Sequence, residues 1–247
     1  MLSSEQKQDL QRDGFLHLKG AVAPELVDVA LQTINARIGE GVPAEEIGIW
    51  SARSWFPELQ TLPAITDLYN SSGVGEVVSE LLGGHGSEAQ SGQLALRFPR
   101  PVGTQSSAPG PHIDGLHTPT NGVPHGTLGS FTALVGVFLT PVSRPNAGNF
   151  CVWPGSHLKM QDYFREHGTG ELLGGQMPRL DWGEGVQLEA QPGDAVIAHY
   201  QLLHGVAMNT SPLPRFCTFF RVTHPLHKEN RLDCLTDLWL EWSGVKA

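Results

Sequence analysis

Residues 191–205 read Gln-Pro-Gly-Asp-Ala-Val-Ile-Ala-His-Tyr-Gln-Leu-Leu-His-Gly. The Pro-Gly-Asp segment is typical of a tight turn, and the apolar residues 195–198 that follow predict a buried strand. A second turn over residues 209–214 leads into Arg215 and another apolar run. Two strands joined by such a turn are expected to lie side by side. His204, near the end of one, and Arg215, at the start of the next, should therefore face the same interior.

Similar apolar runs recur through the rest of the chain, separated by Gly, Pro and Asn turns. They are residues 93–98, 131–139, 149–153, 186–190, 195–199 and 216–222. Short strands without interleaved helices favour an antiparallel sandwich or barrel. We therefore predict a mainly β fold with flanking helices, in one domain over residues 1–247. Residues 91–225 form its core, and residues 226–247 form a C-terminal extension.

Residues 1–90 are predicted to be mainly helical and to cover the β-core. Ser3 can cap a first helix that ends at Gly14, with Gln6 as its capping-box partner. Residues 15–18 alternate like a short strand. Pro24 opens a second helix, whose apolar positions recur at four-residue steps. A third helix is expected over residues 63–82, and it ends at two glycines.

Composition and charge narrow the class of protein. The chain has 247 residues, a formal net charge of −9, 40% hydrophobic residues and 17% charged residues. This is the composition of a globular protein, and its acidic balance argues against nucleic acid and membrane surfaces as partners. The polar N-terminus does not resemble a signal peptide, and no apolar run is long enough to cross a bilayer. Three widely spaced cysteines argue against a disulfide framework or a cysteine-rich zinc site. We therefore expect a cytoplasmic protein.

A His-Ile-Asp segment at residues 112–114 carries the first candidate metal ligands. In an extended chain, residues two apart point to the same face, so His112 and Asp114 converge while Ile113 packs on the other side. His204 would complete a set of two histidines and one carboxylate. That set is typical of oxygen-activating Fe(II) and leaves coordination positions open. A His-x-Asp segment alone is a weak signal, since two surface polar residues give the same pattern.

Arg215 is the candidate for binding a co-substrate. We expect it to point into the β-core, where a guanidinium is unfavourable unless a carboxylate satisfies it. The C5 carboxylate of 2-oxoglutarate fits the planar fork of an arginine. Charge-assisted hydrogen bonds of this kind contribute roughly 1.5–3 kcal/mol each, which is enough to select a dicarboxylate over a simple keto acid.

Other histidines compete for the metal. His199 is interpreted as a hydrogen-bonded structural residue, because His204 stands in the more favourable Leu-His-Gly context. His117 and His125 lie in residues 114–130, a segment rich in Gly, Pro and Thr whose length is typical of a lid or binding loop. We assign His117 to substrate or solvent and give His125 no metal role. A Pro-Gly-Ser-His segment that ends at His157 is explained by turn chemistry.

Taken in order, these segments resemble the phytanoyl-CoA dioxygenase superfamily of Fe(II)/2-oxoglutarate oxygenases. The resemblance covers most of the chain. It is carried by Glu5…Asp13-Gly14-Phe15 with Val22…Pro24-Glu25, by His112-Ile113-Asp114, by Gly148-Asn149-Phe150-Cys151-Val152-Trp153-Pro154-Gly155-Ser156-His157, and by Gly193-Asp194…His204-Gly205…Asn209…Arg215. Several blocks in the correct order are more specific than any one of them.

The resemblance implies a double-stranded β-helix core (a cupin-like jelly roll) that uses Fe(II), 2-oxoglutarate and O₂. It implies that His112, Asp114 and His204 hold the iron and that Arg215 holds the 2-oxoglutarate. Halogenating members have a small residue at the position of Asp114, so halogenation is disfavoured.

Further contacts to 2-oxoglutarate are less defined. Leu94, Leu96 and Phe138 are candidates for lining its pocket, and core packing is an equally good account of each. Arg53 is a candidate for the lysine that some members use near 2-oxoglutarate. Members often carry Trp on the strand after the His-x-Asp loop, where this chain has Val137 and Phe138.

The expected function is hydroxylation of an unactivated C–H bond in a small metabolite or natural-product intermediate, with release of succinate and CO₂. Desaturation or oxidative cyclisation could use the same residues. Two functions of other classes stay open. One is a metal-binding β-barrel without oxygenase activity, against which the complete residue set argues. The other is a zinc or manganese hydrolase or isomerase, which has no reason to bury Arg215.

Overall fold

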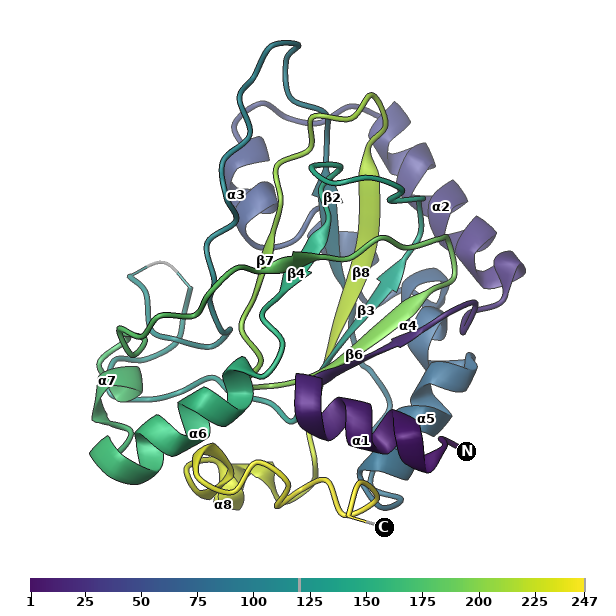
Figure 1. The fold of residues 1–247 in the computed structure, drawn as a ribbon. Coiled ribbons are helices and arrows are strands. Elements are labelled where there is room, and N and C mark those ends of the chain that lie inside the picture. Colours follow the sequence, from purple (N-terminus) through teal and green to yellow (C-terminus); the bar gives the residue numbers. More distant parts are fainter. Residues whose placement is uncertain (120, 247) are drawn as a thin grey trace.

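The computed structural model describes residues 1–119 and 121–246. In these residues, eight strands form two antiparallel sheets (Figure 1). The larger sheet has the order β1 (Phe15–Leu18), β6 (Ala195–His199), β3 (Ala133–Phe138), β8 (Arg215–Val222) and β2 (Gln93–Arg97). The smaller sheet has the order β5 (Val186–Gln187), β4 (Phe150–Val152) and β7 (His204–Val206). This arrangement confirms the predicted β-core with flanking helices.

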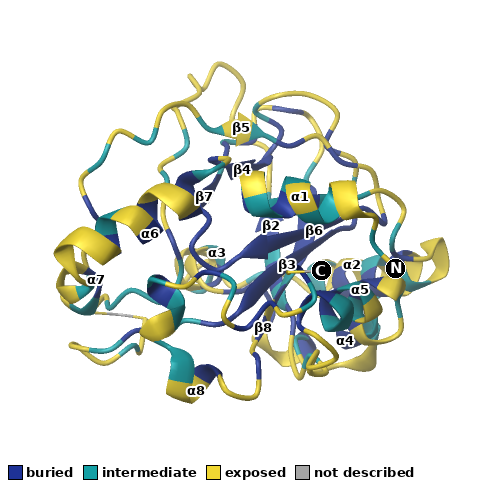
Figure 2. Ribbon diagram, turned by 60° about the horizontal axis from the view of Figure 1, so that its bottom comes forward, coloured by how far each residue is buried: buried dark blue, intermediate teal, exposed yellow. Residues whose placement is uncertain are grey.

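The helices lie mainly around the outside of the sheets (Figure 2). They are α1 (Ser4–Asp13), α2 (Pro24–Gly39), α3 (Ile47–Ala52), α4 (Pro63–Asn70), α5 (Gly73–Leu81), α6 (Ser156–His167), α7 (Gly170–Leu173) and α8 (His227–Asn230), with short 3₁₀ turns at Pro57–Leu59 and Asp233–Leu235. None of these helices, in the part of the chain that the structure describes, is long and apolar enough to span a bilayer.

Capping chemistry explains where α1 begins and ends. Ser3 and Gln6 form the predicted capping box, with each side chain accepting from the other residue's backbone N–H. Gly14 ends the helix at φ 85°, a left-handed conformation that favours glycine. A Cβ atom there would also lie 2.6 Å from the ring of His157, so both the backbone and the packing require glycine.

Two helix predictions were incomplete. The single helix expected over residues 63–82 is two helices, because the Ser72 side chain accepts a hydrogen bond from Val74 N and caps a new helix. The Pro-Gly-Ser-His turn continues directly into α6, which the sequence analysis did not predict. The Ser156 hydroxyl accepts from Leu203 N at 2.9 Å, so it fastens the start of α6 to the chain just before β7.

The expectation that the strands flanking the 209–214 turn pair with each other was wrong. β7 pairs with β4 in the smaller sheet, whereas β8 pairs with β2 and β3 in the larger one. The Asn209 side chain donates to the carbonyls of Arg97 and Leu213 and holds this crossing in place. The turn therefore carries the chain from one sheet to the other.

Side chains alternate between the two faces of the central strands and pack into two cores. Val135 and Ile197 face a core between the larger sheet and the helices, where they join Ile34 of α2. Leu134 and Val196 face a second core between the two sheets. Because both faces are covered, all six residues of β3 are buried. The candidate site lies on the side of the larger sheet that faces the second core.

Candidate metal centre

His112 and His204 are brought together by backbone pairing. The two residues form an isolated antiparallel bridge, with His112 N donating to His204 O and His204 N donating to His112 O, both at 2.9 Å. Directly opposed residues on antiparallel strands place their side chains on the same face. The imidazole rings accordingly lie 4.6 Å apart between centroids. Two side chains that are 92 positions apart in the sequence (204 − 112) therefore lie next to each other in the fold.

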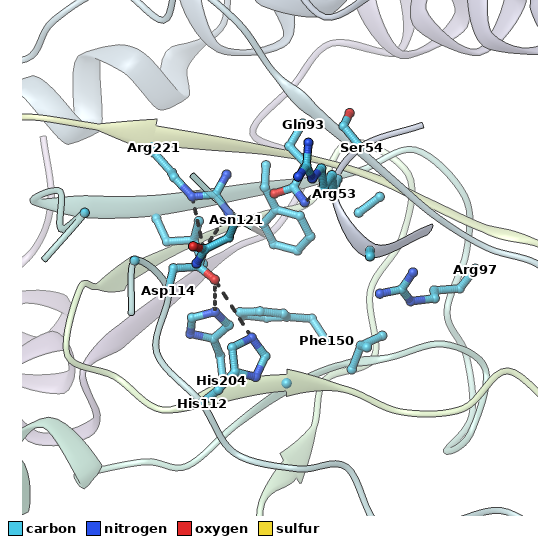
Figure 3. A pocket seen from close by; sticks show the side chains of 18 of the residues that line it. Arg53, Ser54, Gln93, Arg97, His112, Asp114, Asn121, Phe150, His204 and Arg221 are labelled. Atoms are coloured by element: carbon cyan, nitrogen blue, oxygen red, sulfur yellow. Dashed lines mark hydrogen bonds and ion pairs between the residues drawn. The ribbon is translucent and has the colours of Figure 1, made fainter. Parts of the chain in front are cut away.

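Asp114 completes the group, and its two oxygens have different surroundings (Figure 3). Oδ1 lies 3.7 Å from His204 Nε2 and 3.9 Å from His112 Nε2. Oδ2 accepts from Arg221, from Nε at 3.1 Å and from Nη2 at 2.5 Å. One carboxylate oxygen thus faces the histidines while an arginine occupies the other. This division favours binding of a metal through a single oxygen of Asp114.

The hydrogen bonds of the two histidines leave the correct nitrogens available. Nδ1 of His204 lies 3.1 Å from Leu202 O, and Nδ1 of His112 lies 3.5 Å from Gly110 O. A proton on Nδ1 leaves an unprotonated Nε2, which is the form that ligates a metal. Burial, followed by the charge of His204, lowers the pKa of His112, which favours its neutral form. The residues therefore fit a divalent cation such as Fe(II), with the three donor atoms within 4.8 Å of one another.

Ionised Asp114 is also favoured. Burial opposes its ionisation, but interactions with His204 and Arg221 outweigh burial and hold the pKa of Asp114 well below its usual range. Its backbone is fixed as well, since Tyr200 Oη donates to Asp114 O at 3.0 Å. Asp114 lies in a turn, and the extended strand expected for residues 112–114 is reduced to the bridge at His112. Ile113 packs into the core between the sheets, as predicted.

The segment after Asp114 begins and ends at a close contact of two glycines. Gly129 N donates to Gly115 O at 2.9 Å. Gly115 has φ 80°, and a Cβ atom on it would lie 2.3 Å from Gly129 O, so only glycine fits. Asn121 and Val123 of this segment line the pocket. The glycine contact therefore holds one wall of the pocket beside Asp114.

A cavity of about 590 Å³ opens in front of the three ligand candidates. Its lining holds four arginines, at positions 53, 97, 215 and 221, and one carboxylate, that of Asp114, among the residues that the structure describes. This volume is within the range of roughly 300–1,000 Å³ that is typical of small-molecule sites. The excess of cationic side chains suits an anionic ligand, although the whole chain carries a net charge of −9.

Arg215 lines this cavity and is buried, with 2% of its surface exposed. Nε donates to Gly148 O at 2.7 Å and Nη1 donates to Ala95 O at 2.8 Å. Burial lowers the pKa of Arg215 to about 10, so it remains charged at neutral pH. These bonds to backbone carbonyls correct the expectation that only a carboxylate could satisfy Arg215. They use two of its five N–H groups and fix the guanidinium plane.

Arg97 lies beside Arg215. The two residues are direct partners in the β2–β8 register, so their side chains share the pocket face. Burial, followed by the charge of Arg100, lowers the pKa of Arg97. Its Nη1 donates to Ser51 O at 3.1 Å. Two adjacent guanidinium groups in a partly buried setting favour a ligand that brings negative charge.

Three of the predicted 2-oxoglutarate contacts lie elsewhere. Leu94 and Leu96 belong to the core between the larger sheet and the helices, because the β2 residues on the pocket face are Gln93, Ala95 and Arg97. Phe138 is fully buried in the core between the sheets and is not part of the cavity lining. Core packing is therefore their role in this structure. Arg53 does line the cavity, and its carbonyl accepts from the Gln93 side chain.

The competing histidines have other partners. His199 Nε2 lies 2.9 Å from Leu238 O, and its Nδ1 accepts from Gln201 N at 3.0 Å, which is the structural role expected for it. His157 Nε2 lies 3.1 Å from Gln11 O. His117 Nδ1 lies 2.6 Å from Val123 O, and the ring of His125 lies 5.3 Å from the ring of His117. Among the residues that the structure describes, none of these four histidines belongs to the lining of the cavity.

Sequence reasoning missed Arg221 and Arg97. Residues 215, 217, 219 and 221 share one face of β8 because side chains alternate along a strand. Arg221 could therefore have been placed on the same face as Arg215 from its even spacing alone. Arg97 could not, because its position depends on the register between β2 and β8.

Several solved structures share this fold. The non-heme α-ketoglutarate-dependent epimerase SnoN from nogalamycin biosynthesis is 18% identical, with a TM-score of 0.57 over 89% of this chain and 81% of that chain. HygX from Streptomyces hygroscopicus, solved with iron bound, is 17% identical, with a TM-score of 0.57 over 91% of this chain and 88% of that chain. EctD from S. alaskensis, solved with 2-oxoglutarate and 5-hydroxyectoine, is 17% identical, with a TM-score of 0.57 over 90% of this chain and 76% of that chain. These similarities support the predicted cupin-like fold.

Iron and 2-oxoglutarate, the predicted metal and co-substrate, are present in structures of these similar proteins. No curated protein sequence matches the chain. The family model for phytanoyl-CoA dioxygenase matches residues 10–217, which include His112, Asp114, His204 and Arg215. That match spans most of the sequence and confirms the resemblance that its motifs indicated: the chain belongs to the phytanoyl-CoA dioxygenase family.

Proposed function

We propose that this protein is an Fe(II)- and 2-oxoglutarate-dependent oxygenase that hydroxylates an unactivated C–H bond of a small metabolite or natural-product intermediate. The observation that carries the proposal is the shared cavity. His112, Asp114 and His204 present three donor atoms to it within 4.8 Å of one another, and the buried cation Arg215 lines the same space. Family membership supports the same chemistry.

The metal ligands would be Nε2 of His112, Nε2 of His204 and Oδ1 of Asp114. When bound, ferrous iron with 2-oxoglutarate and O₂ supplies the oxidising chemistry and yields succinate and CO₂. The chain supplies geometry. Arg221 occupies Oδ2 of Asp114, which leaves a set of two histidines and one carboxylate oxygen with positions open for other ligands.

Arg215 would bind the C5 carboxylate of 2-oxoglutarate. Its guanidinium is fixed by Gly148 O and Ala95 O before any ligand arrives, so less side-chain entropy is lost on binding. Arg97, its neighbour across the β2–β8 pair, adds a second positive charge. The cationic lining supports a dianionic co-substrate and a small, polar substrate.

Formation of succinate from 2-oxoglutarate tests the proposal. Purified chain, loaded with Fe(II) under anaerobic conditions, is mixed with 2-oxoglutarate and then with O₂, with and without a panel of small metabolites. We expect succinate in the wild type, even when no substrate is supplied, and none in Asp114→Ala. Wild-type protein that binds Fe(II) and 2-oxoglutarate but forms no succinate under any condition would make it a binding protein. Products from the panel would distinguish hydroxylation from desaturation or cyclisation.

A further inference from the structure

A second group of potential metal ligands lies in the C-terminal segment. His227, Cys234 and Glu241 follow one another at intervals of seven residues (234 − 227 and 241 − 234). Their donor atoms all lie within 4.8 Å of one another. His227 is at the start of α8, and Cys234 is in the 3₁₀ turn at Asp233–Leu235. The group is separate from the cavity at His112 and uses none of its residues.

The side chains of His227 and Glu241 are buried, which is unusual for a carboxylate. The side chains of His227 and Glu241 are 3% and 1% exposed. Oε2 of Glu241 accepts from Thr132 Oγ1 at 2.6 Å and lies 2.9 Å from His227 Nδ1. Oε1 accepts no hydrogen bond from a nitrogen or oxygen donor among residues 1–119 and 121–246, and the Cys234 thiol interacts with the same carboxylate. A buried carboxylate oxygen without a strong donor is unfavourable unless a cation or such a donor reaches it.

The surrounding contacts orient the three side chains. Ser130 Oγ lies 2.9 Å from His227 Nε2, so the other ring nitrogen, Nδ1, is directed at Glu241. Thr132 fixes Oε2 of Glu241 and leaves Oε1 available. Outer hydrogen bonds that hold a histidine ring and a carboxylate in place are typical of metal sites in proteins.

We propose that His227, Cys234 and Glu241 bind a divalent transition-metal ion of the zinc class as a structural site. Imidazole nitrogen, thiolate sulfur and carboxylate oxygen are the ligands that Zn²⁺ uses in proteins. Bound ligand atoms would lie about 3–4 Å apart, given metal–ligand bonds of roughly 2.0–2.3 Å. A small cavity of about 10 Å³ adjoins the three residues and could hold one water as a fourth ligand.

Several charged or titratable side chains surround the group of His227, Cys234 and Glu241. Burial, followed by the charge of Glu241 and its hydrogen bond with the thiol, raises the pKa of Cys234, and Asp237 and Asp233 on the same segment add to this effect. Metal binding would displace that proton to solvent and leave the thiolate on the ion. Arg231 and His199 also line the small cavity. Burial lowers the pKa of His199 to about 3, so His199 is neutral.

Arg231 provides the alternative. Its Nε also lacks a hydrogen-bond partner among the described residues. One buried water between Arg231 Nε and Glu241 Oε1 would satisfy both groups without any metal. The two readings differ in one respect that can be measured directly, because only the metal site places sulfur on an ion. The candidate ligands at His112, Asp114 and His204 include no sulfur.

Cobalt(II) is the probe that separates these readings. Metal-free full-length chain is titrated anaerobically with Co²⁺, and the near-ultraviolet charge-transfer band of a cobalt–thiolate bond is followed together with bound cobalt. We expect two Co²⁺ per chain and the thiolate band in the wild type. Asp114→Ala should lose one equivalent and keep the band, whereas Cys234→Ser should lose the other equivalent together with the band.

Two controls keep the outcome decisive. Cys151→Ala removes a buried cysteine outside the group and should retain the band. Metal-free Cys234→Ser should unfold at the same temperature as the metal-free wild type, and only the wild type should gain thermal stability from Zn²⁺. Absence of the band from the wild type, or its persistence in Cys234→Ser, would overturn the proposal. A wild type that binds only the one Co²⁺ lost in Asp114→Ala would indicate the buried water instead.

Discussion

Two groups of histidines in this chain lie in contrasting surroundings. His112 and His204 turn Nδ1 toward backbone carbonyls and Nε2 toward a cavity and a carboxylate. His157 and His199 pack among the aromatic rings near the C-terminus, where the His199 ring stacks on Trp242 at 5.5 Å between centroids. Histidine is thus available to a ligand in the first group, whereas in the second group its ring is used for packing and structural hydrogen bonds. What each nitrogen faces, and not burial alone, separates the two, since His204 is itself only 6% exposed.

The largest expected effect comes from replacing one histidine of each group by glutamine and comparing the two variants. His204→Gln should abolish Fe(II) binding, because it removes one of three ligands, a loss greater than the roughly 10–100-fold effect of losing an outer hydrogen bond. His199→Gln, the matched control, should bind Fe(II) as the wild type does and lose about 1–3 kcal/mol of unfolding free energy. Equilibrium iron binding and urea unfolding measure the two quantities. Iron binding that depended on His199 would invalidate the contrast.

The second effect concerns Arg215, which combines both behaviours: it donates to two carbonyls and still lines the cavity. Arg215→Met should raise the KM for 2-oxoglutarate by about 10–100-fold, because one charge-assisted contact of roughly 1.5–3 kcal/mol is lost. Arg215→Lys keeps the charge but lacks the planar fork of the guanidinium, so its KM should fall between those of the wild type and Arg215→Met. Succinate formation at varied 2-oxoglutarate is the measurement. An unchanged KM in Arg215→Met would shift the role to Arg97.

The pH dependence of stability tests the packed group. Burial lowers the pKa of His157 to about 4, below its ordinary value near 6.5. The unfolded chain then binds more protons between these values, so the stabilisation is complete above pH 6.5 and is lost as the pH falls toward 4. We expect His157 to make the free energy of unfolding about 2 kcal/mol smaller at pH 5 than at pH 7. The difference in that pH dependence between wild type and His157→Gln reports it, and equal slopes would contradict a buried neutral His157.

The smallest expected effect is at Arg221, which contacts Asp114 and lies outside the set of metal ligands. Arg221→Met should weaken Fe(II) binding by about tenfold, because Asp114 loses the partner that orients it. Arg221→Lys retains the charge and should recover part of the affinity. Titration with Fe(II) under anaerobic conditions measures both. Tighter binding in Arg221→Met would mean that repulsion between Arg221 and the metal outweighs orientation.

Much of the fold could be predicted because it depends on local rules. The capping box at Ser3, the helix that opens at Pro24 and the strand at residues 195–199 each follow from the nearby sequence. Predictions failed where a contact from elsewhere decided the outcome. The start of α6 is fastened by Leu203, and the 209–214 turn is held by a carbonyl of β2.

The candidate site divides in the same way. The types of the ligands and their even or odd spacing are properties of the sequence, so His112, Asp114, His204 and Arg215 could be named from it. Pocket lining and core packing were equally good accounts of Leu94 and Leu96, and Arg97 was overlooked, because the face that a strand turns to the cavity depends on its partners. Only the tertiary structure pairs His112 with His204 and gives Arg221 to Asp114. Backbone pairing between distant segments fixes which side chains meet, and no local pattern records that register.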